Sequence, residues 1–320
     1  MQRGISFQKG LAYLDRRRLG MSVEEYRWYA FNNRWRKQIF LDENQKVRLP
    51  NIEYCFVNGC NFRCEHCHTF SPFRQGISPK DEVIDSLRHW GQRLFPQEVR
   101  LLGGETFLHP HIAEIAAAAK AAFPDAKTVI YTNGSLISNI QNSKLQAIHD
   151  IGVLIRISKH MDTPDYNRGI QQSILRLREF QVSYEVLPSN IHWRTCYGID
   201  RQGVPVPAQS RNLESTFCHC GAKYCPAIHR NSLYFCSHLE NTIRAFQEGA
   251  IGLEWHQVLK HQPVTLESTP QEILHYLRGG AMAECSICPE KPELTEARQL
   301  TGEEVRVIKE RIREEKRKAA

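Results

Sequence analysis

The middle of the chain alternates short apolar runs with segments whose apolar residues recur every three or four positions. The apolar runs are 52–57, 99–102, 127–132, 153–158 and 182–187, and the helix-like segments between them are 80–94, 111–123, 140–149 and 165–180. Strands that alternate with helices at this spacing predict βα units and a parallel sheet. Five or six such units form an open sheet or a partial barrel, and periodicity alone does not separate the two. In either case, ligands bind at the carboxyl ends of the strands.

Different patterns precede and follow these units. Ser22 and Glu25 form a capping-box pattern, and Tyr26–Phe40 carries apolar residues at helical spacing, which predicts an amphipathic helix. Residues 210–289 are rich in Cys, His and short strand-like pieces, and we expect their apolar core to be too small to stand without metal. Thr301–Lys318 alternates charges around apolar residues at helical spacing, which predicts a charged surface helix.

Composition narrows the class of protein. The 320 residues are 41% hydrophobic and 24% charged, as in globular proteins, which excludes a collagen or a disordered tail. The sequence has no apolar run of about eighteen residues and no secretory signal at its start, so we expect a cytoplasmic protein without a membrane partner. The net charge is +7, and most of the basic excess lies in residues 1–50.

The eleven cysteines are the first functional lead. A disulfide framework is disfavoured in a reducing compartment, where so many cysteines usually bind metal. Three of them follow the first predicted strand, as Cys60, Cys64 and Cys67. Three thiolates at this spacing can wrap one cubane iron–sulfur cluster and leave its fourth iron open, as a catalytic centre requires. A closed zinc site with His66 or His68 as fourth ligand is the alternative.

The pattern Cys60-x3-Cys64-x2-Cys67 resembles the signature of the radical S-adenosylmethionine (radical SAM) superfamily. In that family the residue before the last cysteine is usually aromatic and lies along the adenine, and here His66 occupies this position. The resemblance covers roughly residues 51–187. It implies a partial (β/α)6 barrel, a [4Fe–4S] cluster held by the three cysteines, and bound S-adenosylmethionine.

The ends of the next strands extend the resemblance. Gly103, Gly104 and Glu105 resemble the family's Gly-Gly-Glu-Pro motif with Thr in place of Pro, and the resemblance implies that the carboxylate binds the methionyl amine. Two glycines also let a backbone approach a ligand closely. The third and fourth strands end near Asn133 and Ser158, for which the resemblance implies cofactor contacts. Ordinary loop capping is the alternative for both residues.

The resemblance also implies a mechanism. A reduced cluster gives one electron to S-adenosylmethionine, which cleaves to methionine and a 5′-deoxyadenosyl radical, and this radical takes a hydrogen atom from the substrate. Such an enzyme needs a one-electron donor such as flavodoxin or ferredoxin. The cofactor supplies the difficult chemistry, and the protein supplies its position and excludes water.

A second set of cysteines follows the predicted strands, at positions 196, 218, 220, 225, 236, 285 and 288. Their spacing resembles the auxiliary-cluster modules called twitch and SPASM, with Asn231 in place of a glycine. The chain has no cysteine after Cys288, which favours the twitch form with one auxiliary [4Fe–4S] cluster. The implied ligands are Cys218, Cys236, Cys285 and Cys288.

Several alternatives remain open for this second set. Cys220 fits the spacing as well as Cys218 does, and four cysteines also suit zinc. We expect Cys55 to be a buried small hydrophobic residue. Cys196 or Cys225 could donate a hydrogen atom near the substrate or act as an extra ligand.

The expected organisation has four parts. They are an N-terminal helical extension (1–50), a radical SAM partial barrel (51–210), a twitch-like auxiliary-cluster module (211–295) and a charged helix (296–320).

The leading functional hypothesis is a radical SAM enzyme of oxidoreductase or epimerase type. We expect it to act on a small polar substrate, such as a sugar, aminocyclitol or amino acid. The alternative is modification of a ribosomally made peptide. A non-catalytic, metal-stabilised nucleic-acid binder rests only on the basic N-terminus with Trp28 and Trp35, so nucleic acid is a disfavoured partner. Sequence identifies no catalytic residue beyond the cofactor motifs, and five polar residues are unranked candidates near the barrel mouth: Arg156, Lys159, His160, Arg168 and Tyr197.

Overall fold

The computed structural model describes residues 27, 34–187, 192–296 and 298–319. One mixed sheet of nine strands dominates the molecule, in the order β12-β11-β10-β2-β3-β4-β5-β6, with β1 paired to β2. The sheet is open, because β12 and β6 form its two edges. Its strands are β1 (Phe40–Leu41), β2 (Val47–Val57), β3 (Leu94–Gly103), β4 (Lys127–Thr132), β5 (Leu154–Ser158), β6 (Tyr184–Leu187), β10 (Ala227–His229), β11 (Ser232–Tyr234) and β12 (Val264–Thr265).

The five predicted strands are confirmed as β2 to β6, each parallel to its neighbour. β2 and β3 begin earlier than predicted, at Val47 and Leu94. β10 also runs parallel to β2, on its other side, through the pair Ala227 and Glu53. The α/β fold with an open, partial-barrel arrangement of parallel strands is therefore as expected.

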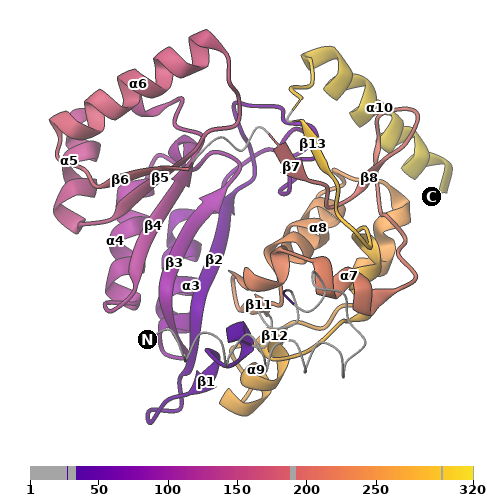
Figure 1. The fold of residues 1–320 in the computed structure, drawn as a ribbon, viewed down its shortest axis with the longest axis horizontal. Helices are drawn as coiled ribbons and strands as arrows, with labels where there is room; N and C mark the ends of the chain where they lie inside the picture. The colour runs from indigo at the N-terminus through magenta and orange to yellow at the C-terminus, as the bar shows by residue number, and fades with distance from the viewer. Residues whose placement is uncertain (1–26, 28–33, 188–191, 297, 320) are drawn as a thin grey trace, which may run out of the picture.

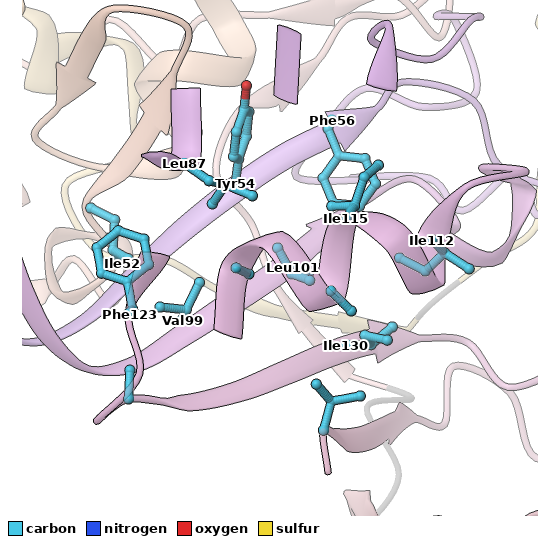
Figure 2. Packing of buried hydrophobic residues seen from close by; sticks show 14 of the residues in the cluster. Ile52, Tyr54, Phe56, Leu87, Val99, Leu101, Ile112, Ile115, Phe123 and Ile130 are labelled. Atoms are coloured by element: carbon cyan, nitrogen blue, oxygen red, sulfur yellow. The ribbon is translucent and has the colours of Figure 1, made fainter. Parts of the chain in front are cut away.

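The four predicted helices of the repeat are confirmed and cover one face of this sheet (Figure 1). They are α3 (Lys80–Gly91), α4 (Ile112–Ala122), α5 (Asn142–Ile151) and α6 (Pro164–Glu179). Successive strand side chains point to opposite faces, so alternate residues of β2 enter the core: Ile52, Tyr54 and Phe56 are fully buried. Figure 2 shows them among side chains of the helices and neighbouring strands, including Ile112 and Ile115 of α4.

The C-terminal part of the chain forms a second group of elements, opposite α3–α6 in Figure 1. Its helices are α7 (Leu213–His219), α8 (Ser237–Gln247), α9 (Pro270–Leu277) and α10 (Gly302–Ala319), and its small strands are β7 (His192–Arg194), β8 (Gly198–Ile199), β9 (Pro205–Val206) and β13 (Leu294–Glu296). β7 pairs with β13 and β8 with β9. Short 3-10 helices lie at Thr106–Leu108, Ile137–Asn139, Ala222–Tyr224, Leu253–Lys260 and Ala283–Ile287.

The segment 210–289 shares its apolar core with residues from other parts of the chain. A second hydrophobic cluster forms around the fully buried Trp255 and includes Leu239 and Ile243 of α8 and Ile308 and Ile312 of α10. The β10–β11 hairpin meanwhile joins the main sheet. Residues distant in sequence therefore supply the apolar partners that the segment lacks by itself.

The terminal helices have different outcomes. Seven of the fifteen residues of the predicted helix Tyr26–Phe40, Trp28 among them, lie outside the described residues, as does the Ser22–Glu25 capping box. Within the described part, helical backbone ends at residue 36 and Phe40 already belongs to β1. The C-terminal helix is confirmed as α10. No helix in the described part of the chain is long and apolar enough to cross a bilayer.

Candidate metal centres and cofactor site

The first cysteine loop leaves the carboxyl end of β2 and is packed directly against the end of β3. Gly104 N donates to Val57 O at 2.7 Å, and Glu105 N donates to Gly59 O at 3.0 Å. A Cβ added at Gly103 would overlap the Val57 backbone, and one at Gly104 would overlap the Gly59 carbonyl. The two glycines thus allow a close approach to the cysteine loop itself.

The loop holds two thiols, those of Cys60 and Cys64, in an environment that disfavours their charged form. Burial, with a smaller contribution from the nearby Cys67 thiol, raises the pKa of both Cys60 and Cys64 to about 12. A thiolate that is buried away from water needs a neighbouring positive charge. A bound iron ion would supply this charge and deprotonate the thiol. The donor set therefore fits a thiolate-bound metal centre.

Gln299, which sequence reasoning missed, binds this loop from the far end of the chain. Its side-chain Nε2 donates to Cys64 Sγ at 3.0 Å, and its Oε1 accepts from Arg63 N at 2.9 Å. Backbone bonds flank it: Leu300 N donates to Arg63 O, and Glu65 N donates to Arg298 O, both at 2.8 Å. Nothing local in the sequence signals this contact, because the two segments lie at opposite ends of the described chain.

Glu105 is fully buried, and its carboxylate joins the ends of β3 and β4. Oε1 accepts from Thr132 Oγ1 at 2.7 Å and from Phe107 N at 3.0 Å, and Oε2 accepts from Asn133 N at 2.8 Å. Burial raises the pKa of Glu105, whereas these three hydrogen bonds act to lower it. The carboxylate thus positions the ends of two strands below the cysteine loop, and its contact with a methionyl amine stays a prediction.

Asn133 and Ser158 lie near each other at the ends of β4 and β5. The Asn133 amide donates to Asn61 Oδ1 at 2.9 Å and lies 3.8 Å from Cys60 Sγ, so it contacts the cysteine loop. The Tyr166 hydroxyl of α6 bonds the backbone carbonyls of both Asn133, at 2.6 Å, and Ser158, at 3.5 Å. These contacts bring both predicted cofactor residues to the edge of the sheet that carries the loop.

His66 faces the C-terminal part of the molecule. It adopts a left-handed backbone conformation with φ of 56°, and its ring lies 5.4 Å from the Tyr197 ring. Burial lowers its pKa, and its Nδ1 is buried without a hydrogen-bond partner. The flat ring is therefore neutral, although its predicted contact with an adenine stays a prediction.

The sheet face opposite α3–α6 carries a ladder of charges. Arg100 pairs with Glu53 at 3.2 Å and with Glu98 at 2.6 Å, while Arg156 pairs with Glu98 at 3.0 Å and with Glu185 at 2.9 Å. Burial acts to raise the pKa of Glu98, but hydrogen bonds from the two arginines lower it below its ordinary value. This face thus presents fixed cations and anions at the centre of the partial barrel.

Four cysteines of the second set line one cavity together: Cys220, Cys236, Cys285 and Cys288. Burial raises the pKa of Cys285 to about 11 and that of the other three above the ordinary value, with neighbouring thiols adding to the rise for Cys236, Cys285 and Cys288. Lys223 also lines this cavity and partly offsets the effect at Cys220. Of the two alternatives left by the sequence, Cys220 lines the cavity, and Cys218 is not among its lining residues in the described chain.

The remaining cysteines lie in three different places. Cys55 is buried in β2, as expected, and accepts from Asn241 Nδ2 at 3.3 Å. Cys225 lies on the charged sheet face, where an Arg100 guanidinium nitrogen is 3.6 Å from its Sγ. Cys196 Sγ lies 3.6 Å from His68 Nδ1. Burial, with smaller contributions from the Cys220 and Cys67 thiols, raises the pKa of Cys196 to about 12.

Comparison with known proteins agrees with this geometry. Residues 54–193 match the model of the Radical SAM superfamily. A nucleotide dehydratase dependent on S-adenosylmethionine, from Thermoplasmatales archaeon (strain ISO4-H5), is 28% identical over 128 residues, which are 39% of this chain and 44% of that protein. A GTP 3′,8-cyclase from Microcystis aeruginosa (strain NIES-843 / IAM M-2473) is 27% identical over 123 residues, which are 37% of this chain and 36% of the cyclase. The matching part of the chain thus spans less than half the length of these relatives.

Among solved structures, BtrN in complex with AdoMet and 2-DOIA is similar at 14% identity, with a TM-score of 0.41, over 70% of this chain and 81% of BtrN.

The cysteine loop and the strand ends beneath it lie within the part of the chain that matches this family model. Residues 54–193 are thus similar to the radical SAM superfamily, over less than half of the chain.

Proposed function

We propose that this protein removes a hydrogen atom from a small polar substrate, giving dehydrogenation or epimerisation. The substrate class is a sugar, an aminocyclitol or an amino acid. The observation that carries the proposal is the charged face of the parallel sheet, with its network of ion pairs. An apolar substrate would have to desolvate these ion pairs without replacing their hydrogen bonds, whereas hydroxyl, amine and carboxylate groups can bond to them.

The residues that would hold the cofactors are those of the two cysteine sets. Cys60, Cys64 and Cys67 would hold a [4Fe–4S] cluster, and Asn133, Ser158 and residues 103–105 would contact S-adenosylmethionine. When bound, this cluster and S-adenosylmethionine supply a 5′-deoxyadenosyl radical. Protein groups then have two tasks, which are to position the substrate C–H bond and to exclude water.

The four cysteines of the second cavity would hold an auxiliary [4Fe–4S] cluster, and here our proposed ligand set takes Cys220 in place of Cys218. The thioether of Met282 and the ring of Phe235 also line the cavity, which makes it largely apolar. An apolar shell around thiolates restricts solvent, a factor that tunes the reduction potential of iron–sulfur centres. A nearby redox centre would suit a dehydrogenation, in which a second electron leaves the substrate.

Deuterium transfer tests the substrate class. Anaerobically reconstituted protein is reduced with dithionite and incubated with S-adenosylmethionine and a panel of deuterated sugars, aminocyclitols, amino acids and peptides. We expect mass spectrometry to find deuterium in 5′-deoxyadenosine with one of the first three classes. Transfer from peptides alone would overturn the proposal in favour of peptide modification.

A matched pair of arginine variants tests the role of the charged face. Arg156 donates hydrogen bonds to Glu98, Glu185 and the Tyr131 hydroxyl. Arg168, in contrast, pairs only with the exposed Asp165 among the described residues. With the substrate identified, Arg156→Met should raise KM at least about tenfold, the effect of losing one charged hydrogen bond of about 1.5 kcal/mol. Arg168→Met should leave KM unchanged.

Cys225 distinguishes the two outcomes of the reaction. Its thiol lies on the charged face, where it could return a hydrogen atom to the substrate from the side opposite to abstraction. For an epimerase, Cys225→Ala should retain 5′-deoxyadenosine formation and lose the epimer. A dehydrogenase should instead keep its oxidised product in this variant.

A further inference from the structure

Three side chains with metal-binding atoms meet outside both the Cys60–Cys67 loop and the set of four cysteines that lines the cavity. They are His68, Cys196 and His238, and one ligand atom of each lies within 4.8 Å of the other two. His68 follows the first cysteine loop, Cys196 lies between β7 and β8, and His238 is in the first turn of α8. Three separate segments of the fold therefore converge on this point, which a local turn would not produce.

The other nitrogen of each imidazole is already engaged. His68 Nε2 lies 3.1 Å from Ser237 Oγ, and His238 Nδ1 lies 3.4 Å from the His68 carbonyl oxygen. Histidines that bind metal usually have their second nitrogen held in this way, by a hydroxyl, carbonyl or carboxylate that fixes the ring. This arrangement leaves His68 Nδ1 and His238 Nε2 available as ligands.

His238 carries the second, independent observation. Its side chain is 1% exposed, and its Nε2 is buried without a hydrogen-bond partner. Buried polar atoms are nearly always paired, and an unpaired one calls for an explanation such as an ion. A cation between the three side chains would supply the partner.

The spacing suits zinc. In a tetrahedral site with Zn–N of about 2.0 Å and Zn–S of about 2.3 Å, neighbouring ligand atoms are about 3.5 Å apart. His68 Nδ1 and Cys196 Sγ are already 3.6 Å apart, so only His238 has to move. Two imidazoles and one thiolate are donors that zinc accepts readily, with water as the fourth ligand.

We propose that His68, Cys196 and His238 bind one zinc ion, separate from both iron–sulfur clusters. The ion joins the first cysteine loop to α8, whose N-terminal residue follows Cys236 of the second set. It thereby fixes the distance between the two cysteine sets. Zinc has no redox chemistry, so it does this without competing for electrons.

The test measures metal content, independently of any cleavage of S-adenosylmethionine. Full-length protein is reconstituted anaerobically until iron reaches about eight atoms per chain, four for each cluster, and is then equilibrated with zinc sulfate and desalted. We expect about one zinc per chain by elemental analysis. X-ray absorption at the zinc edge should show two nitrogens and one sulfur among the ligands.

Three variants make the assignment specific. Cys196→Ala should lose the zinc and keep the iron, whereas Cys225→Ala, which removes a half-buried cysteine outside the proposed zinc site, should keep both. Ser237→Ala keeps all three ligands and removes only the bond that orients His68. We expect about 10–100-fold weaker zinc affinity in this variant, a typical effect of losing an outer hydrogen bond.

Four results would overturn the proposal. They are no zinc in the iron-loaded protein, zinc with four sulfur ligands, copper at the same position, and loss of iron rather than zinc in Cys196→Ala. The last would make Cys196 a cluster ligand. Because the readout is zinc, a failure here leaves the proposed enzymatic function untouched.

Discussion

The side-chain amide of Gln299 donates a hydrogen bond to Cys64 Sγ at 3.0 Å, although the two residues are 235 positions apart in the sequence. The Gln299 backbone also forms an isolated antiparallel bridge with Cys64. The segment that precedes α10 therefore acts as a short additional strand on the cysteine loop. A hydrogen bond to a cluster sulfur stabilises the more electron-rich, reduced state.

Replacing Gln299 should therefore change the reduction potential of the cluster on this loop. In Gln299→Leu we expect the midpoint potential to fall by on the order of 50 mV, since about 59 mV equals a tenfold change in a one-electron equilibrium. Redox titration followed by electron paramagnetic resonance measures this shift. Gln271→Leu, an exposed glutamine of α9, is the control and should not move the potential. An unchanged potential in Gln299→Leu would show that the hydrogen bond does not tune the cluster.

Gly104 should be intolerant of any side chain. A Cβ there overlaps the Gly59 carbonyl, and neither backbone can yield without moving the cysteine loop. Gly104→Ala should lower the iron bound at this loop to less than half. Gly169→Ala in α6 is the matched control, because a Cβ there meets no atom within 4 Å. It should raise the free energy of unfolding by about 0.5–1 kcal/mol. Equal iron contents in the two variants would contradict the packing argument.

The two candidate ligands of the second set can be separated by iron analysis. Cys220→Ala should lose about four of about eight irons per chain, the content of one cluster. Cys218→Ala should keep them, because Cys218 is not among the described residues that line the cavity. The reverse pattern would restore the assignment that the sequence spacing first favoured.

Acid should destabilise the protein in part through His160. Burial lowers the pKa of His160 to about 4, below the ordinary value of 6.5. Between these values the unfolded chain binds more protons than the folded one, so the free energy of unfolding falls as the pH drops from about 6.5 to 4. The loss is at most about 1.4 kcal/mol for each unit of pKa difference.

His160→Asn should flatten this dependence, and denaturant unfolding at several pH values between 7 and 5 measures it. The control is His256→Asn, since the His256 side chain is exposed. A slope in His160→Asn equal to that of the control would show that His160 does not contribute.

The sequence predicts the parallel sheet well because its signals are local. Alternating runs of apolar residues identify β2 to β6, and β4 (Lys127–Thr132) has the predicted bounds. β2 extends back through Pro50, although proline usually ends a strand. Among the described residues, β10 pairs with β2 only at Glu53, which lies three residues after Pro50. The missing N–H of Pro50 therefore costs no hydrogen bond to β10.

Contacts between distant segments are what the sequence does not reveal. The spacing of the first three cysteines identifies the loop, because all three lie within eight consecutive residues. The choice between Cys218 and Cys220 depends instead on how the end of α7 packs against the cavity. The ligand atoms of His68 and Cys196 come together only when the segment after the first cysteine loop packs against the segment between β7 and β8. One feature of the sequence indicates the charged face. Arg100 and Arg156 each lie between apolar residues of a strand, so their side chains point to the face opposite their apolar neighbours.

The central claim is that Cys60, Cys64 and Cys67 hold a cluster that cleaves S-adenosylmethionine. Its most direct test is chromatographic detection of 5′-deoxyadenosine after anaerobic reduction of the iron-loaded protein with dithionite in the presence of S-adenosylmethionine. We predict that the protein forms this product and that the triple Cys→Ala variant, with its second cysteine set intact, forms none. Product at the same rate in the triple variant, or none in the iron-loaded protein, would contradict the account.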